Sequence, residues 1–115
     1  MMTIVEALSS SQPYTEEAEF LDKLKDWLEL QPNTKVLRIC DRYQKGYADL
    51  FLCVNGTFVA MELKDDKGTA SPHQKQFIAD IQKAGGIAGV CRSFQDAASL
   101  LCVANARTGH YDFRR

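Results

Sequence analysis

Three charged residues at one end of a predicted hairpin have the types and spacing needed for metal-assisted chemistry. Asp49 lies near the start of one apolar run, and Glu62 and Lys64 lie at the end of the next. The two runs meet at Asn55-Gly56, a pair that favours a type I′ turn. An antiparallel pair closed by this turn places residue 49 opposite about residue 62. We therefore expect two carboxylates and one amine to converge at one end of a sheet.

This arrangement suits the capture of a divalent cation. Two carboxylates about 4 to 5 Å apart repel each other unless a positive charge lies between them. Mg²⁺ prefers a few carboxylate and carbonyl oxygens together with water, and the Leu63 carbonyl is a candidate third protein oxygen. Lys64 would hold or polarise a water on the metal, while the metal makes that water a better nucleophile and neutralises charge on a phosphate. The chemistry indicated is hydrolysis of a phosphodiester.

The spacing is weak evidence on its own. An acid-x-Lys triplet arises by chance about once in a chain of this length, and a second one, Asp65-Asp66-Lys67, follows directly in a loop. Residues two apart on a strand share a face. The alternative interpretation is therefore an ordinary ion pair between Glu62 and Lys64 on a solvated sheet face.

Hydrophobic periodicity predicts the elements that would position these residues. In chain order, we expect a helix from 15 that ends at Pro32-Asn33, strands at 35–40, 48–54 and 57–64, a helix from 71 that stops at Gly85-Gly86, a strand at 87–91 and a helix from 93 to about 104. The order α-β-β-β-α-β-α predicts an α/β fold with one mixed sheet of about four strands. Residues 1–14 are expected to form a flexible lead-in, and residues 105–115 a tail.

Each predicted helix begins at a capping residue. Thr15 is expected to cap the first helix, and Ser93 the third. Ser71 and Gln74 match a capping box at the start of the second helix. Gln74 therefore has a structural role available in addition to any catalytic one.

Composition places the chain among soluble globular proteins and decides little else. The 115 residues suffice for one domain, and the formal net charge is -1. This balance argues mildly against a protein that coats DNA, although a nuclease remains possible because an acidic metal site offsets nearby Lys and Arg. Apolar runs are far shorter than the roughly 20 residues of a membrane span, and the N-terminus does not resemble a signal peptide.

The four cysteines do not suggest a zinc site. Cys40, Cys53, Cys91 and Cys102 lie far apart, form no CxxC pair and have apolar neighbours. We expect them to be small buried side chains in a reducing cytoplasm.

Two longer stretches carry a family resemblance. GYADLFLCVNGTFVAMELK at 46–64, followed by SPHQKQFIADIQKAGGIAGVCRS at 71–93, resembles the VRR-NUC nucleases of the PD-(D/E)xK superfamily, whose folds are restriction-endonuclease-like and junction-resolvase-like. The ordered parts are an acid on the first helix, Gly-x-x-Asp, Glu-x-Lys, Ser-x-x-Gln and a Gly-Gly strand that ends in Arg92-Ser93. The match runs from about residue 17 to 101. Ala48 stands where the family usually has proline before the Asp. This replacement affects the rigidity of the chain leading to Asp49 more than the chemistry of the site.

The resemblance implies a role for each matching residue. Asp49 and Glu62 would bind Mg²⁺ or Mn²⁺ together with the Leu63 carbonyl. Lys64 would orient the attacking water. Gln74 would reach the site from its helix start and contact either the water on the metal or the phosphate.

The acid on the first helix is best placed at Glu17, because Glu17 precedes Phe20 and Leu24 on the apolar face. Glu16 is the second choice, and Glu19 fits less well. The alternative for Glu17 is an ordinary first-turn acid favoured by the helix dipole.

Basic residues supply candidate contacts to nucleic acid, since Arg and Lys make most contacts to phosphates. The main candidates are Lys45, Lys67 and Arg92, and further ones are Arg107, Arg114 and Arg115. Each also fits an ordinary solvated surface charge.

The resemblance implies a metal-dependent, structure-selective DNA endonuclease, with branched DNA such as a four-way junction as substrate. Small family members resemble junction resolvases that act as homodimers, which suggests a homodimer here and a phage or mobile-element setting. One alternative is a nuclease for flaps or single-strand ends. Others are a non-catalytic nucleic-acid-binding module of the same fold, which the intact acid-acid-lysine set disfavours, and a small α/β interaction protein.

Overall fold

The computed structural model describes residues 2–39 and 48–107 of the chain. The elements in order are α1 (Ile4–Leu8), α2 (Glu17–Glu29), β1 (Thr34–Arg38), β2 (Leu50–Val54), β3 (Thr57–Leu63), α3 (Pro72–Lys83), β4 (Ile87–Cys91) and α4 (Phe94–Ala106). All seven predicted elements are present, and α1 is additional. None of the described helices has the length and apolarity needed to cross a bilayer.

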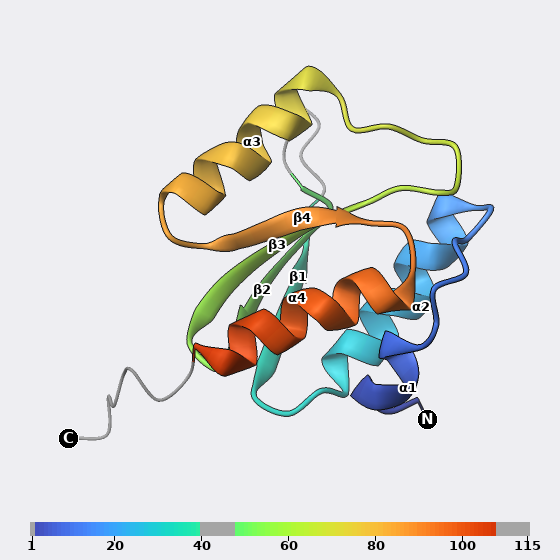
Figure 1. Ribbon diagram of the computed structural model, residues 1–115, viewed down its shortest axis with the longest axis horizontal. Coiled ribbons are helices and arrows are strands. Elements are labelled where there is room, and N and C mark those ends of the chain that lie inside the picture. The colour runs from blue at the N-terminus through green and yellow to red at the C-terminus, as the bar shows by residue number, and fades with distance from the viewer. Residues whose placement is uncertain (1, 40–47, 108–115) are drawn as a thin grey trace.

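The four strands form one mixed sheet in the order β1-β2-β3-β4 (Figure 1). The β1–β2 and β2–β3 pairs are antiparallel, and the β3–β4 pair is parallel. Asn55 and Gly56 both have positive φ, 50° and 84°, which is the conformation of a type I′ turn. The predicted α/β fold and its hairpin are confirmed.

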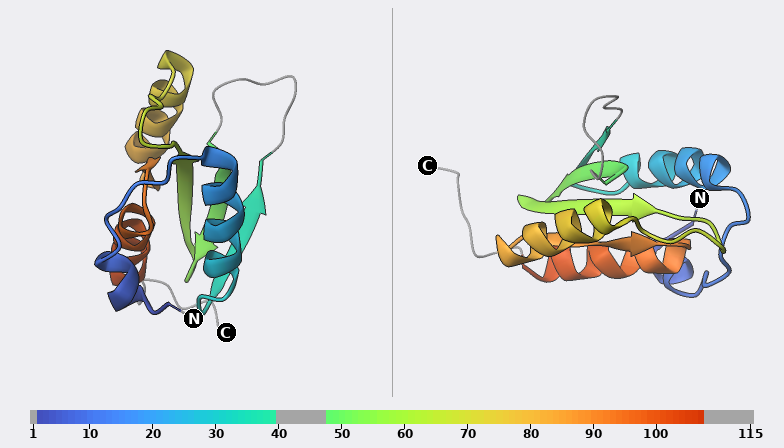
Figure 2. Two further views of the ribbon diagram at one scale, coloured as in Figure 1. Left: turned by 90° about the vertical axis from the view of Figure 1, so that its right-hand side faces the viewer. Right: turned by 90° about the horizontal axis from the view of Figure 1, so that it is seen from above.

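Helices cover both faces of the sheet, so the central strand β3 is buried on both sides. In Figure 1, α3 lies above the sheet, and α1 and α4 lie below it. In the view from above (Figure 2, right), α3 accordingly lies in front of the strands. The larger core joins α1, α2 and α4 to the face of β3 that carries Val59, Met61 and Leu63. On the other face α3 packs over Ala60 and Ala88, whose small side chains allow the helix to approach closely. The solvated face required by the ion-pair alternative is therefore absent at Glu62, which is 1% exposed.

The segment predicted to be a flexible lead-in, residues 1–14, contains the short helix α1. Thr3 and Glu6 form a capping box at its start, and Ala7 is fully buried in the larger core. The Gln95 side chain of α4 donates a hydrogen bond to the Leu8 carbonyl at 2.8 Å. A helix of five residues has too few turns to show periodicity, and its packing against α4 stabilises it.

The start of α2 also differs from the prediction. Its N-cap is Glu16, which is extended and makes no side-chain capping bond, rather than Thr15. The chain just before the helix is held by Tyr14, whose N–H donates to the Arg92 carbonyl at 3.3 Å and whose carbonyl accepts from the Asp66 N–H at 2.9 Å. Tertiary backbone contacts therefore set the start of α2 in place of a side-chain cap.

Burial of the cysteines is confirmed for Cys91 and wrong for two others. Cys91 at the end of β4 is fully buried, and this burial raises the pKa of its thiol. Cys53 and Cys102 are exposed free thiols. Cys53 pairs across the hairpin with Phe58, which is itself 39% exposed, so α3 does not cover this end of the sheet face. Cys40 lies outside the described residues.

Candidate active site

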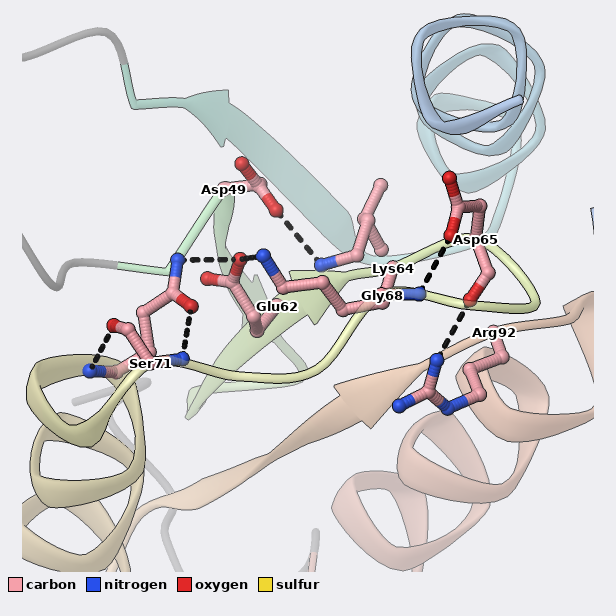
Figure 3. Close-up of polar contacts among 9 residues, drawn as sticks. Asp49, Glu62, Lys64, Asp65, Gly68, Ser71 and Arg92 are labelled. Atoms are coloured by element: carbon pink, nitrogen blue, oxygen red, sulfur yellow. Dashed lines mark hydrogen bonds and ion pairs between the residues drawn. The ribbon is translucent and has the colours of Figure 1, made fainter. Parts of the chain in front are cut away.

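The hairpin register brings the two predicted acids together. Leu50 pairs with Met61, so the next position along each strand carries Asp49 and Glu62. The Asp49 Oδ2 accepts a hydrogen bond from the Leu63 N–H at 2.7 Å, which holds the Asp49 carboxylate against the end of β3. Figure 3 shows the carboxylates of Asp49 and Glu62 on the same side of the strands. The predicted convergence is therefore present.

Glu62 is a buried carboxylate in which one oxygen has hydrogen-bonding and charged partners and the other has none among the described residues. Its Oε1 accepts a hydrogen bond from Gln74 Nε2 at 2.8 Å and lies 3.4 Å from Lys64 Nζ. Its Oε2 is buried and has no hydrogen-bond partner within the described part of the chain. Buried polar atoms are nearly always paired, because an unpaired one costs free energy. Glu62 Oε2 is thus an oxygen with unused capacity to bind a ligand.

The electrostatic environment makes Glu62 a strong base for a carboxylate. Burial, followed by the charge of nearby Asp49, raises the pKa of Glu62 from 4.5 to about 8, although Lys64 acts in the opposite direction. Desolvation and a neighbouring like charge both disfavour the ionised form. A cation between the two acids would reverse both effects.

Lys64 lies directly beyond β3 and turns its side chain back toward Glu62. Its backbone N–H donates to the Cys91 carbonyl at 3.1 Å, which continues the parallel pairing with β4. The side chain is 15% exposed. The ammonium group therefore lies at the mouth of the site, next to the satisfied oxygen of Glu62 and accessible to solvent.

Gln74 is positioned both to cap α3 and to contact the acid of the candidate site. Ser71 and Gln74 form a reciprocal capping box, with the Gln74 Oε1 accepting from the Ser71 N–H at 2.9 Å. The other end of the same amide donates to Glu62. Gln74 thereby fixes the start of α3 relative to the acid on β3, while a contact with phosphate or water stays a prediction.

The structure favours Glu17 over the other acids of this helix. Glu17 is half-buried. Its pKa is raised mainly by burial, with smaller contributions from Asp49 and Asp65 against the opposing charge of Lys64. Glu17 thus shares the electrostatic environment of the site. Glu16 is exposed, and Glu19 forms an exposed ion pair with Lys23 at 2.8 Å.

The donor set fits a hard divalent cation with few protein ligands. Within the described ranges, no group of three or more His, Cys, Asp or Glu side chains is arranged to hold a metal ion. Mg²⁺ usually keeps several waters and takes one or two carboxylates from the protein. Asp49 and Glu62 would supply those carboxylates, and the unpaired Glu62 Oε2 is the atom that a cation would satisfy. The Leu63 carbonyl stays a predicted third ligand.

The candidate contacts to nucleic acid fall into three groups. Lys67 is exposed in the loop after β3. Arg92 and Arg107 each donate an Nη1 hydrogen bond to a backbone carbonyl, that of Asp65 at 2.6 Å and that of Gly85 at 2.7 Å. Both arginines therefore have structural contacts that no sequence pattern indicated. The remaining candidates lie outside the described residues, namely Lys45, Arg114 and Arg115.

Two surface grooves lie apart from the acids. One, of about 500 Å³, is lined by Tyr14, Phe94 and neighbouring residues, and the other, of about 530 Å³, by Phe58, Arg107 and neighbouring residues. Neither includes the two acids or Lys64. These two grooves therefore take no part in the candidate site.

Comparisons with known proteins agree on one domain. A family model described as "VRR-NUC domain" matches residues 2–95. A solved structure titled "VRR_NUC domain" has a TM-score of 0.64 at 22% identity and covers 84% of this chain and 99% of its own. A second, titled "VRR_NUC domain protein", has a TM-score of 0.61 at 20% identity, with 79% and 88% covered. No curated protein matches the chain. At these identities the structural likeness concerns the fold.

Proposed function

The chain belongs to the VRR-NUC family, a nuclease domain family of the PD-(D/E)xK superfamily, and from this premise we propose that it is a Mg²⁺- or Mn²⁺-dependent DNA endonuclease. The observation that supports this most directly is Glu62. It is a fully buried carboxylate with an unpaired oxygen, beside a second acid and a lysine. A protein without a ligand for that oxygen would gain by replacing the acid with an apolar residue.

Asp49 and Glu62 would hold the cation. When bound, the cation supplies a nucleophilic water at neutral pH and stabilises negative charge on the phosphate. Lys64, beside Glu62 Oε1 and open to solvent, orients the attacking water. Gln74 keeps the Glu62 carboxylate in one orientation, and Glu17 adds a further acceptor at the edge of the site.

The substrate within DNA is proposed on the family resemblance. Branched DNA such as a four-way junction is our first choice, cut by a homodimer whose two sites act on two strands. Flaps and single-strand ends are the second choice. The proposed chemistry at the phosphodiester is the same for each of these substrates, so the choice among them depends on experiment.

Cleavage assays test the proposal. Purified protein is incubated with labelled four-way, flap, linear duplex and single-stranded DNA in Mg²⁺, Mn²⁺ or chelator. We expect metal-dependent cutting that falls by at least about 1000-fold in Glu62→Gln, because loss of a metal ligand removes several kcal/mol of stabilisation of the transition state. The matched control is Glu29→Gln, the same exchange at an exposed acid near the end of α2, where Glu29 pairs with Lys25.

Two results would contradict the proposal. DNA binding without cutting in any metal would indicate a non-catalytic binding module of the same fold. Cutting that persists in chelator, or at an unchanged rate in Glu62→Gln, would move the chemistry away from this site.

A further inference from the structure

Arg92 lies at the turn between β4 and α4. Its backbone N–H, its backbone carbonyl and one nitrogen of its guanidinium all form hydrogen bonds within the protein. Its Nη1 donates to the Asp65 carbonyl at 2.6 Å (Figure 3). Its backbone N–H donates to the Asp96 Oδ2 at 2.8 Å. Its carbonyl accepts from the Tyr14 N–H. Short bonds from a charged donor are the stronger class of hydrogen bond. Arg92 is thus a rigid junction of the fold.

These bonds form a closed ring beside the candidate site, on the far side of Lys64 from Glu62. Arg92 contacts Asp65, the neighbouring Asp66 N–H donates to the Tyr14 carbonyl, and the Tyr14 N–H returns to Arg92. The ring ties together the end of β4, the loop directly after Lys64 and the segment three residues before Glu17. Three segments that are distant in sequence are thereby fixed relative to one another at the site.

The loop held by Arg92 lies beside the side chain of Lys64. The Asp65 carboxylate accepts from the N–H groups of Lys67 and Gly68, at 3.0 Å and 2.7 Å, which folds residues 65–68 into a tight turn. A Cβ on Gly68 would lie 3.2 Å from Lys64 Cδ and 3.6 Å from Lys64 Cβ. The same Cβ would lie 3.3 Å from Asp65 Oδ1, so the loop leaves room for no side chain between Gly68 and the methylene groups of Lys64, whose ammonium lies 3.4 Å from Glu62 Oε1.

We infer that Arg92 is a positioning residue for the nuclease reaction, which it serves by holding the 65–68 loop against Lys64 rather than by contacting DNA phosphate. This inference rests on the proposed function. A shift of about 1 Å in a reacting group can cost about 100-fold in rate, so a side chain that fixes the loop has a large effect on the chemical step. A residue that contacts phosphate acts instead on affinity and on its dependence on salt.

The test separates these two roles in the full-length chain. Arg92→Met removes the donor and the charge but keeps most of the aliphatic stem. Single-turnover cleavage at saturating protein measures the chemical step. The dissociation constant for the same DNA, measured in chelator over a range of salt, measures phosphate contacts. Lys25→Met is the control, because it also removes a charged donor, here from an ion pair with Glu29 on α2, and Lys25 is not among the candidate contacts to DNA.

We expect Arg92→Met to lower the saturated rate by about 10- to 100-fold, with the dissociation constant within about twofold and the salt slope unchanged. Lys25→Met leaves all three quantities unchanged. Gly68→Ala, which alters no charge and pushes on Lys64, lowers the same rate by about 3- to 10-fold without weakening binding.

Several results overturn the inference. If Arg92→Met weakens binding and reduces the salt slope by about one unit at an unchanged saturated rate, Arg92 is a phosphate contact. An unchanged rate in a folded Arg92→Met also overturns it. If Arg92→Met does not fold, Gly68→Ala decides, and an unchanged rate there is contradictory. If the wild-type protein cuts no DNA, the proposed function itself is wrong. If the wild type cuts DNA and Arg92→Met cuts it equally fast, only the inference about Arg92 is wrong.

Discussion

Two acid-x-Lys triplets follow one another in this chain, and the structure gives them opposite electrostatics. In the first, Glu62 is buried on β3, and its pKa is raised to about 8 by desolvation and the charge of Asp49. In the second, Asp65 lies in a loop, and the backbone N–H groups of Lys67 and Gly68 hold its pKa below the usual value. The spacing is identical, so the difference comes entirely from where the backbone places each acid.

The comparison shows what separates a structural acid from one available to a ligand. The Asp65 carboxylate is occupied by its own turn, which it stabilises through two hydrogen bonds. Glu62 keeps one oxygen without a partner among the described residues. A bound cation would therefore add little at Asp65 and much at Glu62, and substitutions in the two triplets should have very different consequences.

The largest contrast is expected between the two lysines. Lys64→Ala should reduce single-turnover cleavage by about 100-fold or more, because it removes the ammonium group beside Glu62 that orients the attacking water. Lys67→Ala should leave this rate within about threefold and act through DNA affinity, since its side chain is exposed and makes at most a phosphate contact. Equal losses of saturated rate in the two variants would remove the functional distinction between the triplets.

A smaller contrast is expected between Gln74 and Ser71 at the start of α3. Gln74 lies on this helix and orients Glu62, which lies on β3. Gln74→Ala removes the bond to Glu62 and should lower the cleavage rate by about 10- to 100-fold, as is typical of residues that orient metal ligands. Ser71→Ala removes the other half of the capping box and should cost about 1 kcal/mol of unfolding free energy. Denaturant unfolding and cleavage assays on both variants distinguish them. Gln74 is a capping residue alone if both variants keep the wild-type rate.

The smallest effect is expected in the stability of the metal-free protein. The folded state binds a proton at Glu62 more tightly than the unfolded chain does, so unfolding free energy should fall as pH rises from about 5 to about 8. Asp65 has the opposite sign: its contribution is present above its usual pKa and is lost as pH falls through the depressed value.

Thermal unfolding in chelator measures this slope. Wild type should melt at least about 5 °C lower at pH 8 than at about pH 5.5, and Glu62→Gln should lose most of that difference. Asp65→Asn should keep it, since Asp65 titrates below this range. A wild-type slope that survives in Glu62→Gln would show that another group causes it.

Local signals in the sequence were sufficient for most of the fold and for the central acids. Asn55-Gly56 fixed the hairpin register, and strand alternation then placed Asp49, Glu62 and Lys64 together. Ser71 and Gln74 marked the start of α3 through a capping box that the structure contains. These features depend on residues close in the chain or joined by one turn.

What the sequence did not predict depends on tertiary contacts. The helix α1 is stabilised by packing against α4, and the start of α2 is fixed by the backbone bonds of Tyr14. The bond from Arg92 to Asp65 joins positions 27 residues apart, and no spacing rule encodes such a pair. The exposure of Cys53 follows from the extent of α3, which covers part of one sheet face.

Binding of Mn²⁺ to the DNA-free protein, measured by calorimetry near neutral pH, tests the central claim most directly. We predict a site in wild type that is lost in Asp49→Asn and Glu62→Gln, with protons released on binding because Glu62 must ionise. The same site should persist in Asp65→Asn. Mn²⁺ binding that survives both site substitutions, or that disappears with Asp65, would contradict the account.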